Sequence, residues 1–553
     1  MSLIGVFCRQ NERESAKEFF ELFKTPWEFY HNQRHYDVVL SSGEIPREKT
    51  YSVMFIYDSG KNGVDADLNI RVKSAKNRGL LEFRGTTVPI YEQFSTFEGH
   101  GTALIKMEGS HEVSGLEIKK DNLTFVRIGY DLFQEVGSLL SKGQPSRFAF
   151  SPTLEIHISM LRYWISRSRI PLIEIPPVPI GYDYITCLTH DVDFVGIRNH
   201  MFDRTMFGFI YRALIKTFVD YAKGEPSKKK LFNNWKAALL LPAVYAGIVK
   251  DFWVLFEKYV EIEKGLTSTF YFIPFKKKPG EILCEGASKK RTCKYEASNL
   301  KPYISYLISK GNEIGLHGID AWQDMDLGRK ELAILQKLSG NSEVGIRMHW
   351  LYYDEDTAIT LDKTGFLYDS TLGYNDSVGF FSGTTQVFKH LGVKNLLELP
   401  LNIQDTALFY SSRMNLKASS AFEVAKSLIE EIRKYGGALT VNWHHRSIGP
   451  ERYWDEFYLS LLEYIKKDRV LFLCARDAVK WFKRRRSISF KDVAIAGNRI
   501  KVKLTGEFCG EGGGLALRAN NPNGQLAKDI VQNDGISYSD YPLEPNMNIL
   551  IKN

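Results

Sequence analysis

The sequence predicts an α/β protein whose central part is a sheet of mostly parallel strands. Two observations lead to this fold class. Over residues 180–483, short apolar runs alternate with segments in which apolar residues recur at helical spacing, as they do in parallel α/β folds. The apolar runs are also rich in β-branched and aromatic residues, which is typical of buried strands. So many strand–helix units predict either a barrel-like or an open sheet.

The two ends of the chain differ from this centre. Residues 1–178 combine a helical pattern at 12–23 with strand patterns at 53–57 and 81–83, which predicts an α+β domain. Three prolines within 176–179 form a stiff, extended link at its end. The character of the chain changes again after three successive arginines at 484–486. Residues 499–504 alternate strictly between polar and apolar, which predicts a small all-β domain. The predicted domains are therefore 1–178, 179–483 and 484–553.

Strands and helices can be placed in order along the central domain. The first strand is an apolar run that starts at Ile185 and stops at two carboxylates. Predicted helices at 252–264 and 302–310 end before Gly265 and Gly311, which are helix-stop signals. Further predicted strands lie at 269–274, 313–317, 344–349, 366–368, 397–401, 438–443 and 470–473.

Residues 196–250 interrupt this alternation and are predicted to form a helical insertion. The insertion is basic and partly apolar. Within it, the apolar run at 237–249 is shorter than the roughly 18 residues that a membrane span needs. It predicts either a buried helix or an interfacial helix beside the lysines at 228–230, so peripheral contact with a membrane surface stays open.

Composition narrows the class of protein further. The chain of 553 residues has 44% hydrophobic and 25% charged residues, as ordinary globular proteins do, and is too long for one core. The net charge of +8 is mild for this length, and we predict no nucleic-acid partner. The first nine residues lack a basic segment followed by an apolar one, and the six cysteines are scattered without a CxxC motif. We therefore expect no secretory signal and a reducing, cytoplasmic location.

Reactive side chains stand where four of the predicted strands end. Each has a structural explanation of its own, as a cap, a hydrogen-bonded histidine or a surface ion pair. The carboxyl ends of parallel strands nevertheless share one face of a sheet, so coincidence over four strands favours a site. Its carboxylates, imidazoles and guanidinium are the groups that hydrolysis at a metal ion uses. The residues are Asp191, Asp193, His317, Arg347, His349 and His444.

The order of these motifs resembles the polysaccharide deacetylase superfamily, which is carbohydrate esterase family 4 or the NodB-homology group. The resemblance spans residues 181–481 and is closest to a branch associated with bacterial surface-polysaccharide genes. It implies a distorted (β/α) barrel of NodB type for the central domain. The motifs that carry it are Leu188 to Asp193, Ile314 to Gly318, Arg347 to Leu351, Tyr368 to Tyr374, and Trp443 to Arg446.

The resemblance also implies catalytic roles. Asp191 matches the general base that takes a proton from water, and Arg347 matches the arginine that orients this base. His444 matches the histidine that protonates the leaving amine. Trp350, Tyr374, Asp376 and Asp405 are candidates for the substrate pocket, although packing explains the two aromatic residues equally well. The related branch tends to have arginine where this chain has Phe381.

A divalent metal, zinc or a similar ion, is the implied cofactor. Asp193 and His317 match metal ligands of the family, and these donor types suit such an ion. The family pattern has a second histidine four residues after the first, where this chain has Ala321. His349 is the best substitute for the third ligand, and Asp320 is a weaker one.

The expected function is that of a metal-dependent hydrolase which removes an acetyl group from an N-acetylated sugar in bacterial surface-polysaccharide biosynthesis. A cytosolic precursor, linked to a nucleotide or a lipid, is the expected substrate. One alternative is a metal-independent C–N amide hydrolase on the same barrel, which applies if Ala321 empties the metal site. The other is a non-catalytic glycan-binding protein, against which the retained Asp191, Arg347 and His444 speak.

Overall fold

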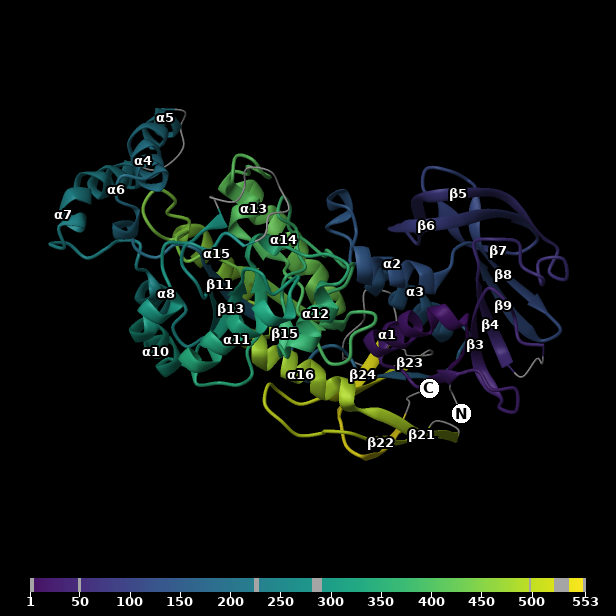
Figure 1. Cartoon of the computed structure of the whole chain (residues 1–553). Coiled ribbons are helices and arrows are strands. Elements are labelled where there is room, and N and C mark those ends of the chain that lie inside the picture. Colours follow the sequence, from purple (N-terminus) through teal and green to yellow (C-terminus); the bar gives the residue numbers. More distant parts are fainter. Residues whose placement is uncertain are drawn as a thin grey trace.

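The computed structural model describes residues 4–47, 51–222, 228–280, 291–496, 499–521 and 537–550. Within these ranges the strands form one nine-stranded sheet, one ten-stranded sheet and two three-stranded sheets. The nine-stranded sheet belongs to the N-terminal region and the ten-stranded sheet to the centre of the chain (Figure 1). The predicted α/β class is therefore confirmed.

The N-terminal sheet has the order β2-β1-β3-β4-β9-β8-β6-β5-β7. It is parallel from β2 to β9 and antiparallel from β9 to β7. Three helices, α1 (Arg13–Phe23), α2 (Leu132–Lys142) and α3 (Thr153–Arg167), share a hydrophobic core with it. The strands are β1 (Ile4–Phe7), β2 (Trp27–Phe29), β3 (Tyr36–Ser42), β4 (Tyr51–Tyr57), β5 (Ile70–Phe83), β6 (Thr86–Gly99), β7 (Thr102–Met107), β8 (Val113–Lys120) and β9 (Leu123–Ile128).

The predicted strand at 81–83 is only the end of β5, which begins at Ile70. Its first half carries charged and polar side chains such as Arg71, Lys73 and Asn77, which are exposed to solvent. Without an apolar run, no strand signal was visible there. The predicted helix at 12–23 is α1, and the predicted strand at 53–57 is β4.

The central sheet has the order β16-β17-β15-β14-β13-β12-β11-β19-β18, and β20 pairs with β11. All its pairs are parallel except β16 with β17. Helices follow most of the strands and surround a barrel-like sheet. The strands are β11 (Tyr184–Val192), β12 (Ser268–Phe272), β13 (Glu313–Gly318), β14 (Ile346–Met348), β15 (Tyr368–Asp369), β16 (Phe388–Lys389), β17 (Leu397–Glu398), β18 (Ile403–Gln404), β19 (Ala438–Asn442) and β20 (Val470–Phe472).

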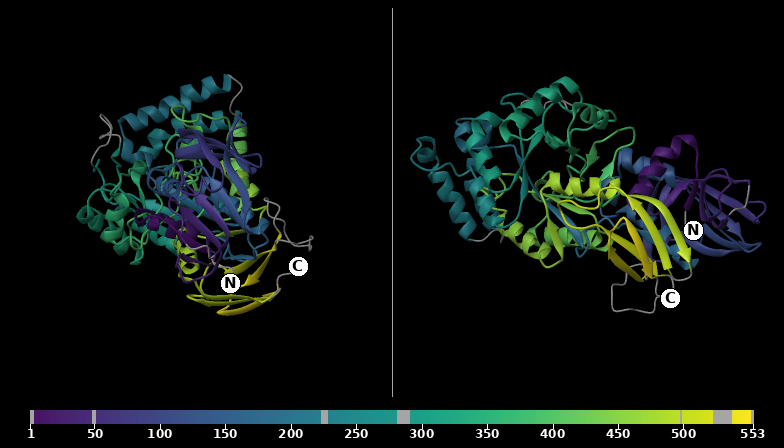
Figure 2. Two further views of the ribbon diagram at one scale, coloured as in Figure 1. Left: turned by 90° about the vertical axis from the view of Figure 1, so that its right-hand side faces the viewer. Right: turned by 90° about the horizontal axis from the view of Figure 1, so that it is seen from below.

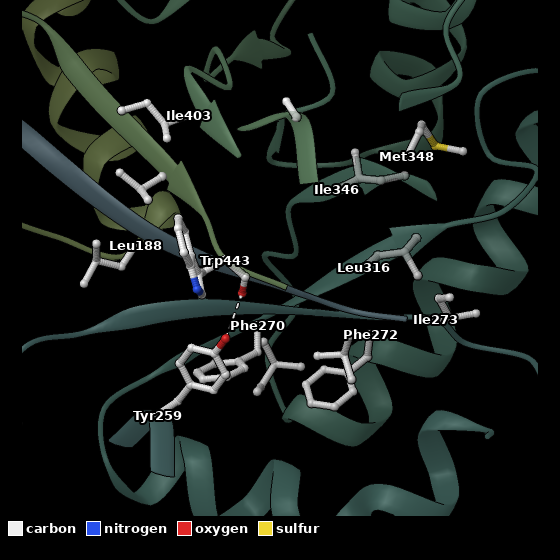
Figure 3. Packing of buried hydrophobic residues seen from close by; sticks show 14 of the residues in the cluster. Leu188, Tyr259, Phe270, Phe272, Ile273, Leu316, Ile346, Met348, Ile403 and Trp443 are labelled. Atoms are coloured by element: carbon white, nitrogen blue, oxygen red, sulfur yellow. Dashed lines mark hydrogen bonds between the residues drawn. The ribbon is translucent and has the colours of Figure 1, made fainter. Parts of the chain in front are cut away.

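Burial explains why these strands read as apolar runs in the sequence. All nine residues of β11 are buried, as are all residues of β12, β13 and β19. Leu188, Phe270, Leu316 and Ile346 come from four adjacent strands and pack into one cluster (Figure 3). The surrounding helices are α8 (Phe256–Ile262), α10 (Lys301–Ser309), α11 (Met325–Ser339), α12 (Thr357–Thr364), α14 (Ala418–Tyr435), α15 (Asp455–Ile465) and α16 (Ala475–Ser487).

The predicted helix at 252–264 starts later than expected. Asp251 Oδ1 accepts hydrogen bonds from the backbone amides of Ile197 (2.9 Å) and Trp253 (3.0 Å). The turn that this carboxylate holds delays the start of α8 to Phe256, because an Asp side chain bonded to nearby amides competes with the helix.

The insertion forms helices that project from the central part of the molecule (Figure 1). They are α4 (Arg204–Ile210), a π-helical segment (Tyr211–Lys216), α5 (Thr217–Ala222), α6 (Lys228–Leu239) and α7 (Leu241–Tyr245). The segment 237–249 is not one buried helix, since it breaks between α6 and α7, and Leu239 and Ile248 are 78% and 80% exposed. No helix in the described residues is long and apolar enough to cross a membrane.

The C-terminal region forms strands, but one of its sheets contains a strand from the N-terminal region. β21 (Ser489–Ala496), β22 (Arg499–Thr505) and β25 (Asn546–Leu550) pair with one another. β23 (Ala516–Asn521) and β24 (Ser537–Pro542) form a second sheet with β10 (Leu172–Glu174). The yellow C-terminal strands therefore lie against both the N-terminal and the central regions (Figure 2).

The arginines at the end of α16 join the three regions. Arg484 donates to the carbonyls of Glu511 and Gly513, and Arg486 pairs with Glu18 at 2.7 Å. Arg485 is buried and donates to the carbonyls of Leu22 (2.9 Å) and Ile175 (2.7 Å). The predicted boundary at 483–484 falls inside α16, and the division into three domains stays a prediction.

We expect Arg485→Met to lower the free energy of unfolding by about 2–3 kcal/mol, because buried carbonyls lose their donor while the apolar stem is kept. Chemical denaturation measures this change. The control is Lys480→Met on the same helix, whose pair with Glu343 is exposed and should contribute less than about 1 kcal/mol. Equal stability of the two variants would contradict the role of Arg485.

Candidate functional site

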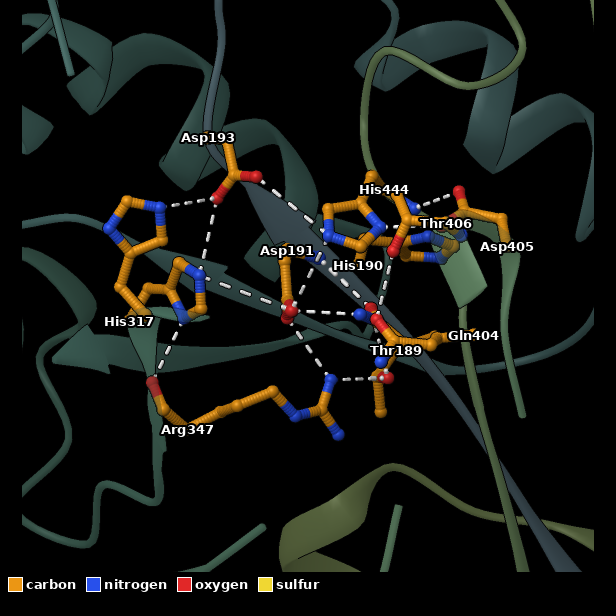
Figure 4. Close-up of polar contacts among 12 residues, drawn as sticks. Thr189, His190, Asp191, Asp193, His317, Arg347, Gln404, Asp405, Thr406 and His444 are labelled. Carbon is orange, nitrogen blue, oxygen red and sulfur yellow. Dashed lines mark hydrogen bonds and ion pairs between the residues drawn. The ribbon is translucent and has the colours of Figure 1, made fainter. Parts of the chain in front are cut away.

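The carboxyl ends of four central strands bring together the reactive residues found in the sequence (Figure 4). The strands are β11, β13, β14 and β19. The strand register places His317 on β13 directly beside Arg347 on β14. In the same sheet, β11 pairs with β12 on one side and with β19 on the other. The chain reaches His349 one residue after β14, and His444 two residues after β19. Parallel pairing therefore gathers residues that lie far apart in the sequence.

Asp193, His317 and His349 form a candidate metal centre. One ligand atom from each residue lies within 4.8 Å of the other two. Asp193 Oδ1 is 3.2 Å from His317 Nε2 and 3.5 Å from His349 Nε2. This oxygen is buried and makes no well-formed hydrogen bond to the protein. A cation would satisfy it, and one carboxylate with two imidazoles is a ligand set that zinc and similar ions accept.

The orientation of the His317 ring is fixed by a hydrogen bond from the nitrogen that does not face Asp193. Its Nδ1 lies 2.9 Å from the carbonyl oxygen of Arg347. Because a carbonyl only accepts, Nδ1 is the donor in this bond, and the lone pair of Nε2 faces Asp193. Histidine ligands of metals are commonly held in this way.

His349, and not Asp320, belongs to this cluster. Ala321, which stands at the family's usual histidine position, is fully buried in the hydrophobic core. His349 begins a tight turn in which Trp350 and Leu351 have φ values of 66° and 54°, a left-handed conformation that costs free energy in residues with side chains. Burial lowers the pKa of His349 to about 3, so its imidazole is neutral and can act as a ligand at neutral pH.

Asp191 is held as a carboxylate beside the metal centre. Arg347 Nη1 donates to Asp191 Oδ1 at 3.0 Å, and Asn442 Nδ2 donates to Asp191 Oδ2 at 2.7 Å. Burial by itself raises the pKa of Asp191, but nearby positive charge, that of Arg347 above all, outweighs it and holds this pKa below its ordinary value. The carboxylate is therefore ionised and oriented at neutral pH.

Arg347 is itself fully buried and fixed on several sides. Its guanidinium donates to the carbonyl of Ser370 (2.9 Å), to Ser370 Oγ (2.8 Å) and to Thr189 Oγ1 (2.8 Å). It also lies over the ring of Tyr271, 4.6 Å from the centroid, where a cation is favoured.

His444 lies on the other side of the two aspartates. Its Nε2 is 4.0 Å from Asp191 Oδ2 and 3.8 Å from Asp193 Oδ2. Its Nδ1 lies 2.6 Å from Asp405 Oδ1, and its backbone amide donates to Asp405 Oδ2 at 2.8 Å. Burial alone lowers the pKa of His444, but Asp405 outweighs it and raises this pKa to about 9. His444 is therefore a cation at neutral pH and has a proton to give.

The structure corrects the predicted place of three pocket residues. Asp405 is fully buried and orients His444. Tyr374 donates its hydroxyl to the carbonyl of Gln144 at 2.7 Å, so its polar end is turned toward the N-terminal region. Asp376 is exposed to solvent and does not line the cleft. Phe381 packs edge-on against Tyr374, with ring centroids 5.2 Å apart.

A cleft of about 170 Å³ opens above the aspartates and histidines. Trp350 lines it. Gln404, Thr406 and Arg413 also line it and were missed, because β18 has only two residues and gives no periodic signal. The other residues of its wall are Phe194, Arg291, Thr292, Cys293, Leu351, Asn375 and Tyr410.

Comparison with known proteins relates the chain to deacetylases. No family model matches it. The peptidoglycan deacetylase-like protein FGM2 of Gibberella zeae is 33% identical over 79 residues, which are 13% of this chain and 23% of that protein. The chain thus matches less than a quarter of this relative's length. The similarity to the polysaccharide deacetylase superfamily, inferred from the motifs, is confirmed at that level.

Two of the solved structures that are similar to the chain are deacetylases. The carbohydrate deacetylase Agd3 is 9% identical, with a TM-score of 0.40, over 100% of this chain and 99% of that chain. The polysaccharide deacetylase Bc1974 of Bacillus cereus is 10% identical, with a TM-score of 0.25, over 53% of this chain and 91% of that chain.

We expect the purified chain to bind one divalent ion, and His349→Ala to weaken this binding at least about 10-fold, because loss of a ligand costs more than loss of its supporting hydrogen bond. Calorimetric titration with zinc after treatment with a chelator measures the affinity. The matched control is His390→Ala, a buried histidine 3.4 Å from Glu398 and outside the cluster. Unchanged affinity in His349→Ala would exclude His349 as a ligand.

Proposed function

We propose that this relative of the polysaccharide deacetylases is a metal-dependent hydrolase that removes the acetyl group from an N-acetylated sugar. One observation carries the proposal: the cluster of Asp193, His317 and His349 shares a cleft with Asp191, which Arg347 holds, and with His444, which Asp405 holds. Amide hydrolysis at a metal ion needs these three parts, namely a ligand set, a base and an acid. The barrel-like central sheet is proposed to be a NodB-type barrel.

Zinc is the proposed ion, since two imidazole nitrogens and one carboxylate oxygen are common zinc donors in sites that keep a position open for catalysis. Such an ion supplies Lewis acidity toward water and toward the acyl oxygen. Asp193, His317 and His349 would hold it.

The two remaining groups handle the protons. Asp191 accepts a proton from the attacking water, while Arg347 and Asn442 keep its carboxylate in place. His444 donates a proton to the amide nitrogen as the C–N bond breaks, and Asp405 keeps it charged and oriented. The products are acetate and a free amine on the sugar. The acid and the base are separate side chains, with His444 Nε2 4.0 Å from Asp191 Oδ2, so each proton has its own site.

The biological setting is proposed from the motif resemblance. The substrate would be a precursor of a bacterial surface polysaccharide, processed in the cytoplasm, and we propose no nucleic-acid partner. The metal-independent alternative gives no reason for a buried, unpartnered Asp193 oxygen beside two histidines. The glycan-binding alternative gives no reason for the buried ion pair that holds Asp191.

Asp191→Asn should reduce acetate release from N-acetylated chitooligosaccharides by about 10²–10⁴-fold, because the amide cannot accept the proton. Release is measured with purified protein in the presence of zinc. Asp326→Asn is the control, since this exposed residue on α11 is not part of the wall of the cleft. Acetate release that survives in Asp191→Asn would remove Asp191 as the base.

Asp405→Asn should shift the alkaline limb of the kcat/KM profile to lower pH. The protonated form of His444 is the active acid, and Asp405 raises the pKa of His444. Without this carboxylate, His444 loses its proton at a lower pH. The enzyme therefore loses its activity at a lower pH as well. In the control variant Asp326→Asn, the alkaline limb of the kcat/KM profile should lie at the same pH as in the wild type. An alkaline limb that stays in place in Asp405→Asn would show that another group is the acid.

A further inference from the structure

Exposed apolar side chains are concentrated in the helical insertion. Fifteen large hydrophobic side chains are exposed in the described part of the chain, and eleven of them belong to the insertion. Exposed apolar residues scattered singly need no explanation, but a contiguous group marks a binding surface. The eleven are Met201, Phe202, Phe207, Tyr211, Ile215, Phe218, Val219, Phe232, Trp235, Leu239 and Ile248.

These side chains are not half of an incomplete core. The inner face of the insertion already packs into its own cluster, in which Met206, Phe209 and Ala213 meet Ala237 and Val244. The exposed residues point the other way. The insertion is therefore apolar on two faces, and only one of them is buried by the protein itself.

The exposed residues form a continuous surface across two helical segments. Phe207, Tyr211, Ile215 and Phe218 recur every three or four residues, as do Phe232, Trp235 and Leu239 on α6, so each set lies on one helical face. The rings of Phe218 and Trp235 stack with centroids 6.2 Å apart and join the two sets. These seven residues, each between 39% and 78% exposed, are called the outer face below.

Basic residues accompany the outer face. Residues 199–250 contain nine Lys or Arg but only three Asp or Glu. Lys216 pairs with Asp220 at 2.7 Å, and Lys229 lies 3.9 Å from Glu456, but both pairs are exposed and therefore weak. The exposed basic side chains among the described residues of this range are Arg204, Lys216, Lys228, Lys229, Lys236 and Lys250.

We propose that the outer face docks on the surface of a bilayer that contains anionic lipid. Helices that lie in a membrane interface combine aromatic and aliphatic residues on one face with Lys and Arg around it. The apolar side chains would enter the boundary between headgroups and acyl chains, and the lysines would pair with lipid phosphates. No helix of the insertion needs to cross the membrane.

Docking on this face would bring the catalytic end of the sheet toward the bilayer. The insertion leaves the carboxyl end of β11 just after Asp193. It is also tied to the segment that follows His444, because Arg212 pairs with Glu451 at 2.8 Å and Asn234 accepts from the amide of Glu451 at 2.6 Å. The proposal itself does not depend on the proposed function.

Sedimentation with vesicles tests the proposal. The full chain should bind vesicles of phosphatidylcholine mixed with phosphatidylglycerol, and bind phosphatidylcholine alone more weakly. The triple variant Phe207→Ser, Ile215→Ser, Leu239→Ser should lose at least about tenfold in partitioning, because apolar area no longer leaves water. The triple variant Lys228→Gln, Lys229→Gln, Lys236→Gln should lose about as much, and only on anionic vesicles at low salt.

The matched control removes exposed apolar residues elsewhere, by Phe150→Ser, Ile308→Ser, Leu459→Ser, and should bind as the wild type does. Thermal unfolding checks that each variant is folded. Zinc binding checks that the candidate metal site is intact, and this measurement separates failed docking from failure of the proposed function. Failure of the wild type to sediment with anionic vesicles would overturn the proposal. So would a dimer that dissociates in the outer-face variant without any vesicle binding, since a second copy of the chain would then cover the face.

Discussion

The buried ion pair between Arg347 and Asp191 is the interaction on which the rest of the site depends. Its two sides lie on β14 and β11, which are separated in the sheet by β13 and β12. The side chain of Arg347 holds the proposed base, and its backbone carbonyl orients His317. One residue thus connects the proton acceptor to the candidate metal centre.

Such a pair is costly to bury, and the surrounding structure offsets the cost. Taking a carboxylate and a guanidinium out of water costs several kcal/mol for each ion unless hydrogen bonds satisfy both. Here Ser370 and Thr189 bind the guanidinium, and Asn442 binds the free carboxylate oxygen. Thr189 lies within β11, Ser370 directly follows β15 and Asn442 ends β19, so the barrel-like sheet itself supplies the preorganisation. His444 and Asp405 repeat this arrangement at the next strand end.

How much could be predicted from the sequence depended on how strongly each residue is tied to a strand. Asp191, Asp193, His317 and Arg347 end long or fully buried strands, and an apolar run followed by a polar residue is a visible pattern. His349 also follows a strand end, but its role as the third ligand was inferred because Ala321 leaves a ligand position empty. No pattern in the sequence indicated Asn442, Gln404 or Arg413, because their roles arise from contacts between distant segments. Tyr374 ends a matching motif, but its hydroxyl binds the N-terminal region. Asp376 lies two residues beyond that motif and is exposed to solvent.

The central claim is that Asp193, His317 and His349 hold one metal ion beside Asp191. A crystal structure of the chain soaked in zinc, with anomalous data collected at the zinc edge, tests this claim most directly. The account predicts one anomalous peak at about 2.0–2.2 Å from one Asp193 oxygen and from Nε2 of both histidines. It also predicts that the Arg347–Asp191 pair stays intact. A peak that excludes His349, or an ion coordinated by Asp191 after its separation from Arg347, would contradict the account.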